Sequence, residues 1–238
     1  MRTRDDEGFW RGVETLFLDA GGVLMHPDWR RVAALLAEHG QPVPAPVLEH
    51  AEARARRALD SAHSIRNSSD ASRWGVYFGD TLKRAGLALP AERLAALVEA
   101  LVIEHRRASL WCHVPVEVAP ALTRLRARGL RLVVVSNADG RLAALMERFG
   151  LAARVDHLLD SHVEGLEKPD PRFFQLALER SGARPESTVH VGDLYHVDVA
   201  GARAAGLRAV LFDPEDLYGD ADCPRLRSLA ELADRLGA

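Results

Sequence analysis

The chain has 238 residues, of which 47% are hydrophobic and 27% are charged, and its formal net charge is -3 at pH 7. This balance is typical of a globular protein with a sizeable core, and it excludes a disordered or fibrous chain. So small a net charge provides no broad attraction for nucleic acid or an acidic membrane, and we expect a small-molecule partner instead.

The amino-terminal segment and the cysteines indicate the compartment. MRTRDDEGFW is polar where a signal peptide is hydrophobic, and no apolar stretch has the length that a membrane span requires. Cys112 and Cys223 lack the spacing of a disulfide framework or a thiolate metal site. We therefore expect a cytoplasmic protein with reduced thiols and a flexible tail over residues 1–11. The sequence contains no signature of an oligomeric state.

In chain order, the first predicted element is a strand at 13–19, and a long helical region follows it. Residues 28–108 have helical periodicity and no convincing strand. Helices are predicted at 28–39, 45–63, 71–85 and 90–107. We therefore expect residues 26–113 to form an inserted helical domain.

Beyond residue 113, helix and strand patterns alternate, starting with a helix at 115–129. Continuous apolar runs predict buried strands at 130–137, 154–161, 187–193 and 207–213. Helical patterns separate or follow these strands at 141–150, 171–182, 196–206 and 228–236. Such alternation predicts a doubly wound parallel α/β sheet, built from residues 12–25 together with 114–238.

Polar residues end four of the five predicted strands. They are Asp19, Ser136 with Asn137, Asp193 and Asp213. In an open parallel sheet, ligands bind beyond the carboxyl ends of the strands. Carboxylates gathered there repel one another unless a cation or a positively charged side chain lies among them, and their grouping predicts a bound metal ion. Oxygen ligands favour Mg²⁺, and the shortage of nearby His and Cys argues against zinc.

Four segments have a recognisable order and spacing. They are DAGGVL (19–24), VVVSN (133–137), EKPDPRFF (167–174) and VGDLYHVDVAGARAAG (191–206). Together they resemble the four motifs of the haloacid dehalogenase-like hydrolases, and the helical insertion resembles that family's helical cap. The resemblance extends from about Val13 to Asp213 and implies a Rossmann-like core.

The resemblance implies a covalent mechanism. Asp19 would be the nucleophile, which attacks phosphorus to form an aspartyl-phosphate that water then hydrolyses. Ser136 and the Asn137 backbone would hold a phosphoryl oxygen. Lys168, one of only two lysines in the chain, would neutralise charge between the nucleophile and the phosphate.

The resemblance also implies a magnesium site. Mg²⁺ would be held by Asp19, by the backbone carbonyl of Gly21 and by Asp193. Asp198 would support the ion through water or a hydrogen bond. These roles imply a Mg²⁺-dependent phosphatase that acts on a small phosphorylated metabolite, with sugar phosphates among the possible substrates.

The first motif departs from the family pattern at Gly21. Most phosphatases of the family have an aspartate there, which protonates the leaving oxygen and later activates water. Loss of such general acid–base catalysis is commonly worth about 10²–10⁴-fold. In the hypothesis that we prefer, the leaving group needs little protonation, or the proton comes from elsewhere. His26 and His196 are the nearest replacement acids.

Two further hypotheses remain open. In one, the protein cleaves a carbon–halogen or carbon–phosphorus bond. Dehalogenases of the family lack the carboxylate that matches Asp193, and phosphonate cleavage requires a cap lysine, for which Lys83 is the one residue available. In the other, the chain is a catalytically weak regulatory module that binds phosphate.

Substrate choice is expected to lie in the insertion, since a lid over the strand ends contacts the part of the substrate that does not react. Residues 64–78 are predicted to form an inward loop between cap helices. Arg66, Asn67, Trp74 and Tyr77 are candidates for binding a polar group or a sugar ring. Packing of the aromatic residues and solvation of the arginine are the alternative.

Overall fold

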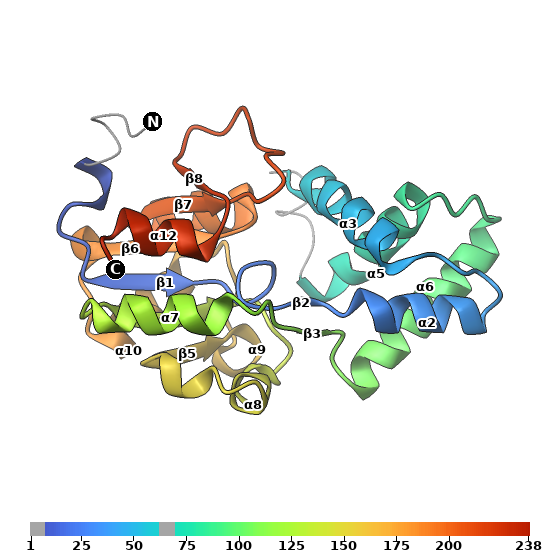
Figure 1. Ribbon diagram of the computed structural model, residues 1–238, viewed down its shortest axis with the longest axis horizontal. Coiled ribbons are helices and arrows are strands. Elements are labelled where there is room, and N and C mark those ends of the chain that lie inside the picture. The colour runs from blue at the N-terminus through green and yellow to red at the C-terminus, as the bar shows by residue number, and fades with distance from the viewer. Residues whose placement is uncertain (1–7, 62–69) are drawn as a thin grey trace. The chain divides into compact units, whose positions relative to one another are not determined.

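The computed structural model describes residues 8–61 and 70–238 (Figure 1). The chain divides into two compact units at Met25/His26 and at His113/Val114. The residues before His26 together with Val114–Ala238 form the α/β unit, and His26–His113 form the helical unit. Each unit has a hydrophobic core of its own.

A six-stranded sheet forms the centre of the α/β unit, in the order β5-β4-β1-β6-β7-β8. Its strands are β1 (Thr15–Leu18), β4 (Arg131–Ser136), β5 (His157–Asp160), β6 (Thr188–Gly192), β7 (Arg208–Phe212) and β8 (Arg225–Leu226). All neighbouring strands are parallel. The predicted doubly wound α/β sheet and its five strands are therefore confirmed, and the two-residue strand β8 is an addition.

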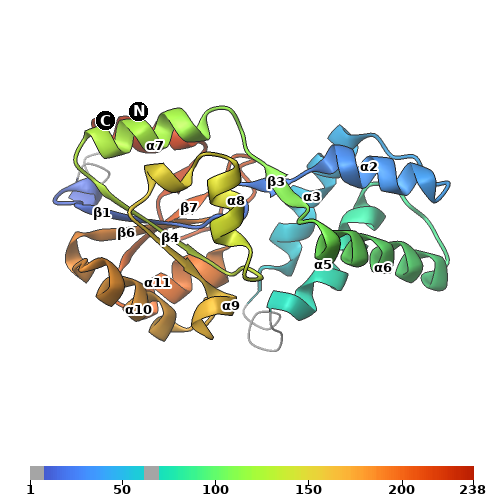
Figure 2. The same cartoon turned by 90° about the horizontal axis from the view of Figure 1, so that it is seen from below.

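Helices cover both faces of this sheet (Figure 2). One face packs against α7 (Val118–Ala127), α8 (Leu142–Arg148) and α12 (Leu229–Arg235), and the other against α10 (Pro171–Ser181) and α11 (Ala200–Ala204). Strand β1 is buried along its whole length: Leu16 and Leu18 enter the first core, whereas Phe17 enters the second. A strand that is buried on both faces cannot alternate between apolar and polar residues.

Shorter elements connect these layers. A 3-10 turn, Ala152–Arg154, leads to β5, and helix α9 (Ser161–Glu164) follows it. A π-helical turn, Tyr195–Val199, stands between β6 and α11, where the sequence predicts continuous α-helix. This turn positions Asp198, whose side chain accepts a hydrogen bond from the backbone N–H of Leu194 at the start of the turn.

The helical unit contains α2 (Trp29–Glu38), α3 (Ala45–Leu59), α5 (Asp70–Arg84) and α6 (Ala91–Arg107). Asp28 caps α2, because its carboxylate accepts hydrogen bonds from the N–H groups of Arg30 and Arg31. Strands β2 (His26–Pro27) and β3 (Trp111–His113) form an antiparallel ribbon that the sequence does not predict. None of the described helices combines the length and apolarity needed to cross a membrane.

The prediction of a flexible tail is wrong for residues 8–11. Residues 8–10 form a helical turn, and Trp10 is buried in the core of the α/β unit. The guanidinium of Arg208 donates hydrogen bonds to the carbonyl oxygens of Phe9 and Arg11. The rest of the predicted tail, residues 1–7, lies outside the described residues.

Candidate active site

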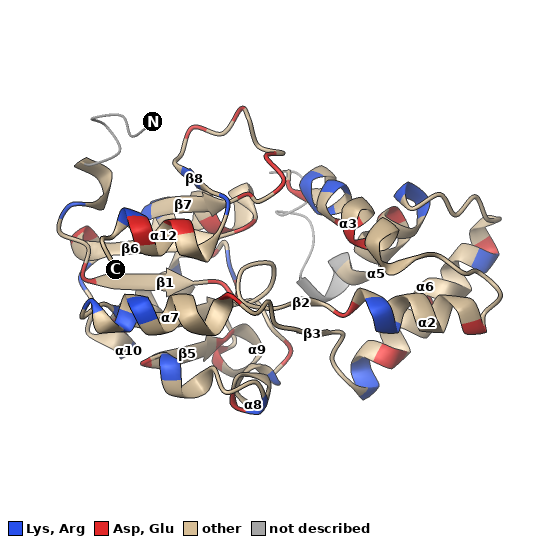
Figure 3. Cartoon of the chain, in the orientation of Figure 1, with Lys and Arg blue, Asp and Glu red and all other residues tan. Residues whose placement is uncertain are grey.

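The site lies at the carboxyl ends of the three central strands, β4, β1 and β6. Asp19 follows β1, Ser136 ends β4 and Asp193 follows β6. The sheet order reverses direction along the chain at β1, and such a switch point is where α/β sheets bind ligands. All three side chains are buried. The acidic end of β1 is red in Figure 3.

Lys168 connects two of the carboxylates. Its Nζ lies 3.0 Å from Asp19 Oδ1 and 2.6 Å from Asp198 Oδ1, and the side chains of Lys168 and Asp198 are both 0% exposed. Burial lowers the pKa of Lys168, but the charges of Asp19 and Asp198 outweigh it, and the pKa lies above the ordinary lysine value. The ammonium group is therefore charged at neutral pH and offers positive charge beside Asp19.

Burial raises the pKa of Asp19, while the charge of Lys168 and a hydrogen bond from the Ser136 hydroxyl oppose that increase. Burial also raises the pKa of Asp198, but Lys168 and His190 outweigh it and hold the value below the usual range. The backbone N–H of Ala20 donates to Asp19 Oδ1 over 2.7 Å. The Asp19 carboxylate is thus fixed by donors from several directions.

Asn137 holds the segment that carries Lys168. Its Nδ2 donates to the Lys168 carbonyl oxygen over 2.9 Å, and the Lys168 N–H donates to Asn137 Oδ1 over 2.7 Å. These two hydrogen bonds join residues that are 31 positions apart. The Asn137 side chain therefore positions Lys168, a role separate from the backbone contact that the sequence predicts.

Three buried carboxylates form a group that has the chemistry of a metal site. One oxygen from each of Asp19, Asp193 and Asp198 lies within 4.8 Å of the others. Oxygen donors of this kind fit a hard divalent cation such as Mg²⁺. The group is compact because Gly22 has no side chain: a Cβ there would lie 1.8 Å from Asp193 Oδ2. Gly21 is half-buried in the same turn, and its backbone bridges to Met25.

Asp198 differs from the other two members of the group. Its Oδ1 accepts hydrogen bonds from Lys168 Nζ and from His190 Nε2, and its Oδ2 accepts one from the Leu194 N–H. With three protein donors, Asp198 is suited to hold neighbouring side chains in place. It is also the most deeply buried of the three, since Asp198 is 0% exposed whereas Asp19 and Asp193 are 8% and 3% exposed.

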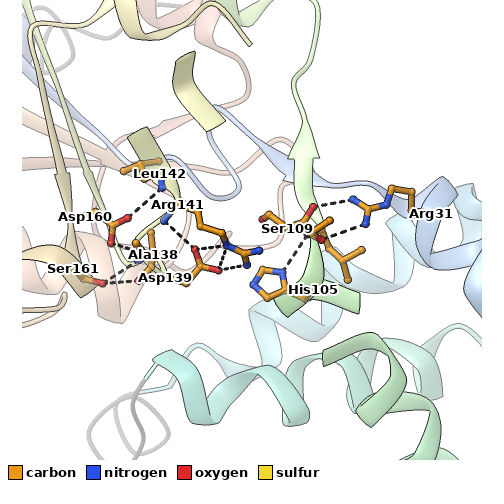
Figure 4. A network of polar contacts seen from close by, with 12 residues as sticks. Arg31, His105, Ser109, Ala138, Asp139, Arg141, Leu142, Asp160 and Ser161 are labelled. Atoms are coloured by element: carbon orange, nitrogen blue, oxygen red, sulfur yellow. Dashed lines mark hydrogen bonds and ion pairs between the residues drawn. The ribbon is translucent and has the colours of Figure 1, made fainter. Parts of the chain in front are cut away.

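Asp160, which fixes the loop after β4, was not among the residues predicted from the sequence. Its carboxylate accepts hydrogen bonds from the N–H groups of Gly140 and Leu142, and Ser161 Oγ exchanges two hydrogen bonds with the Ala138 backbone (Figure 4). This loop begins at Ser136 and Asn137. Asp160 is the next-to-last residue of the predicted strand 154–161 and ends the observed strand β5, so its position in the sequence was a usable signal.

Asp213 is not part of the carboxylate group, contrary to the sequence prediction. Its side chain accepts hydrogen bonds from the N–H groups of Leu217 and Tyr218, and it pairs with Arg225 at 3.0 Å. It therefore stabilises the connection between β7 and β8. The negative charge has its counter-ion twelve residues along the chain and requires no metal.

The proposed replacement acids have different environments. Burial, with smaller contributions from Arg56 and His113, lowers the pKa of His26 to about 4. His26 is therefore neutral near pH 7 and cannot be the proton donor there. His196 is half-buried in the π-helical turn, with its ring centroid 5.2 Å from that of Tyr195.

Among the predicted substrate-binding residues of the helical unit, Arg66 and Asn67 lie outside the described residues. Trp74 packs in an aromatic cluster, with ring centroids 3.8 Å from His105 and 4.4 Å from Trp111. Figure 4 shows His105 beside Ser109, whose carbonyl oxygen accepts a hydrogen bond from Arg31. Trp74 and Tyr77 thus contribute to the packing of this unit.

A buried carboxylate, a charged lysine and an acidic cluster lie together at the switch point of a doubly wound sheet, where such folds bind their ligands. Residues 13–206 match the family model described as haloacid dehalogenase-like hydrolase. The chain belongs to this family, as its four motifs predict.

Named relatives agree with this assignment. The chain is 34% identical over 200 residues to haloacid dehalogenase-like hydrolase domain-containing protein 3 of Bos taurus, covering 82% of this chain and 78% of the relative. It is 40% identical over 160 residues to a phosphoserine phosphatase of Thermus thermophilus, covering 65% and 61%. The magnesium-bound HAD-hydrolase YfnB of Bacillus subtilis has a similar fold, with a TM-score of 0.68, 18% identity and coverage of 95% and 99%. Dehalogenases are among the other solved structures of this fold.

Proposed function

We propose that this protein is a Mg²⁺-dependent phosphatase of small phosphorylated metabolites, with Asp19 as the nucleophile. The observation that supports it most directly is the position of the fully buried Lys168 ammonium, 3.0 Å from Asp19 Oδ1. A positive charge there lets a phosphate dianion approach a carboxylate that would otherwise repel it. Similarity to a phosphoserine phosphatase also favours phosphate ester hydrolysis.

In the proposed reaction, an Asp19 oxygen attacks phosphorus, and the bond from phosphorus to the leaving oxygen breaks with its electron pair on that oxygen. Water then attacks the aspartyl-phosphate and releases inorganic phosphate and the free carboxylate. Ser136 and the N–H groups of the loop after it would hold the non-reacting phosphoryl oxygens. Asp160 and Ser161 support this role because they fix that loop.

The net negative charge of the site is the reason for proposing a bound divalent cation. The three carboxylates and Lys168 carry a formal net charge of about -2 when all four are ionised. A phosphate dianion would raise that repulsion further unless a divalent cation is present. Asp19, the Gly21 carbonyl and Asp193 would hold Mg²⁺, which would polarise a phosphoryl oxygen and offset the charge.

Gly21 restricts the substrates that we propose. The side chain that would protonate the leaving oxygen is missing at this position, and His26 is neutral near pH 7 because its pKa is lowered to about 4. We therefore propose substrates with a leaving group that is stable as an anion or is neutralised within the substrate itself. Sugar 1-phosphates and acyl phosphates have this property.

Cleavage of a carbon–halogen or carbon–phosphorus bond is the second candidate function. Against the first, Asp193 is present and buried within the carboxylate group. Against the second, Lys83 is exposed near the end of α5, where a Schiff base would be open to water. Both observations favour the phosphatase.

A panel of phosphate esters and acyl phosphates, assayed with and without Mg²⁺, tests the proposal. We expect Mg²⁺-dependent release of phosphate that Asp19→Asn abolishes. Asp213→Asn is the matched control, because Asp213 is also a buried aspartate after a strand but lies outside the carboxylate group. Halide release without metal would support dehalogenation, and binding of Mg²⁺ and phosphate without turnover would support a regulatory module.

A further inference from the structure

His190 is a fully buried histidine on the central strand β6, and none of the roles described above requires it. Its Nε2 lies 2.9 Å from Asp198 Oδ1, the oxygen that Lys168 Nζ approaches to 2.6 Å. A chain of contacts therefore runs from His190 through Asp198 and Lys168 to Asp19.

The surroundings of the ring determine which nitrogen carries its proton. A carboxylate oxygen only accepts hydrogen bonds, so Nε2 must be the donor to Asp198. The other nitrogen, Nδ1, is buried and has no hydrogen-bond partner among the described residues. A proton there would be a buried donor without an acceptor, which is costly. The geometry therefore selects the tautomer with hydrogen on Nε2 alone.

Packing holds both partners of this hydrogen bond. Phe174, on α10, contacts the His190 ring edge to face, with centroids 5.0 Å apart and an interplanar angle of 79°. Gly192 leaves space for Asp198, because a Cβ at that position would lie 2.1 Å from Asp198 Cγ. The Leu194 N–H holds the second oxygen at 3.0 Å. The Asp198 carboxylate is thus fixed between β6 and the π-helical turn.

We propose that His190 is a positioning residue, which fixes the Asp198 carboxylate and thereby holds the Lys168 ammonium beside Asp19. Without the Nε2 donor, Lys168 would be the one remaining partner of Asp198 Oδ1 among the described residues, and the Leu194 N–H would be the one described contact that opposes rotation of the carboxylate together with the lysine. The effect of His190 on the position of Lys168 in the substrate-free protein does not depend on which reaction the protein catalyses. The effect on turnover rests on the proposed function.

The two lysines of the chain allow a direct test by NMR. In the full-length protein labelled with ¹³C,¹⁵N-lysine, Lys168 and the exposed Lys83 give separate ammonium signals. We expect His190→Leu to shift the Lys168 signal and to speed exchange of its protons with water, while Lys83 is unchanged. His190→Gln, whose amide reaches about as far as Nε2, should restore the Lys168 signal. An unchanged Lys168 signal in folded His190→Leu overturns the proposal.

The histidine ring gives a second spectroscopic measurement. The ¹⁵N signals that disappear in His190→Gln should report a protonated Nε2 and an unprotonated Nδ1, and the opposite tautomer would also overturn the proposal. If His190→Leu does not fold, His190→Asn replaces it, because the shorter amide does not reach Asp198. Thermal melts of each variant establish folding.

Kinetics with p-nitrophenyl phosphate and Mg²⁺ then measure the effect on turnover. We expect kcat to fall by about 10–100-fold in His190→Leu, with KM little changed, and to recover in His190→Gln. A wild-type protein that has the expected NMR signals but no phosphatase activity would contradict the proposed function and leave the positioning role intact. Full activity in folded His190→Leu would contradict the positioning role.

Discussion

Two features of the structure favour glycine at position 22: a left-handed backbone conformation and a close approach to Asp193. Its φ of 74° lies in the left-handed region, and a Cβ there would lie 1.8 Å from Asp193 Oδ2. Gly40 has nearly the same φ, 73°, and nothing lies within 4 Å of its Cβ position. The two glycines therefore separate the cost of backbone strain from the cost of displacing Asp193.

We expect Gly22→Ala to weaken Mg²⁺ binding, measured by titration calorimetry, and Gly40→Ala to leave it unchanged. Alanine introduces about 1–2 kcal/mol of backbone strain at either position. At position 22 it must also push Asp193 away from the carboxylate group, because the contact is far shorter than any real Cβ contact. Equal Mg²⁺ affinities in the two variants would contradict the assignment of Asp193.

Gly21 provides a gain-of-function experiment. Among the described residues, Gly21 is not one of those with a positive φ, so its φ does not exclude an L-residue there. We expect Gly21→Asp to accelerate hydrolysis of esters with poor leaving groups, by at most about 10²–10⁴-fold, because the carboxylic acid protonates the leaving oxygen. Gly21→Asn is the matched control without an acid. Equal rates in the two variants would mean that the proton comes from another source.

Several residues of the candidate site could be located from the sequence because each lies at the end of an apolar run. Asp19, Ser136 and Asp193 are of this kind, and parallel strands bring their ends to one edge. His190 could not, because a histidine inside an apolar run has the same pattern as a packed strand residue. The prediction for Asp213 was wrong, since its counter-ion, Arg225, lies on the two-residue strand β8, which is too short to show a periodicity.

At the scale of elements, strand prediction succeeds where apolar runs are long. Strands β1, β4, β5, β6 and β7 have at least four residues each, whereas β2 and β8 have two. Two residues cannot establish a period, so the β2–β3 ribbon and the sheet edge at β8 were not predictable. Likewise, the π-helical turn before α11 depends on the hydrogen bond between Asp198 and Leu194, which periodicity does not reveal.

The β2–β3 ribbon makes the stability of the helical unit depend on pH. Burial, aided by Arg56 and His113, lowers the pKa of His26 from 6.5 to about 4. Between these two values, the unfolded chain binds a proton at His26 that the folded chain does not. The free energy of unfolding therefore falls as the pH is lowered through this window, and the loss is complete below the folded-state pKa.

We expect His26→Gln to reduce this pH dependence, measured by denaturant unfolding between pH 7 and pH 4. Tryptophan fluorescence is a suitable signal, because Trp29, Trp74 and Trp111 belong to the helical unit and Trp10 to the other. His39→Gln, at the exposed end of α2, is the control. An unchanged slope in His26→Gln would show that other groups account for the acid sensitivity.

At the scale of the whole molecule, the residues of the candidate site belong to one of the two units. Among the described residues, the carboxylate group, Lys168, Ser136 and His190 all belong to the α/β unit. The family motifs extend only over that unit, so the sequence was informative about chemistry there. The helical unit contains no such motif, and its pattern predicted helices without predicting a substrate.

The β2–β3 ribbon, formed by the two ends of the helical unit, has a practical consequence. His26, where the chain enters the helical unit, pairs with His113, where it leaves. An inserted domain whose two ends lie side by side hardly disturbs the domain that contains it. Any other domain with adjacent termini can connect the same two chain ends. We therefore expect that another domain with adjacent termini can replace the helical unit. Grafting a relative's helical unit at these two positions would test the prediction that this unit selects the substrate.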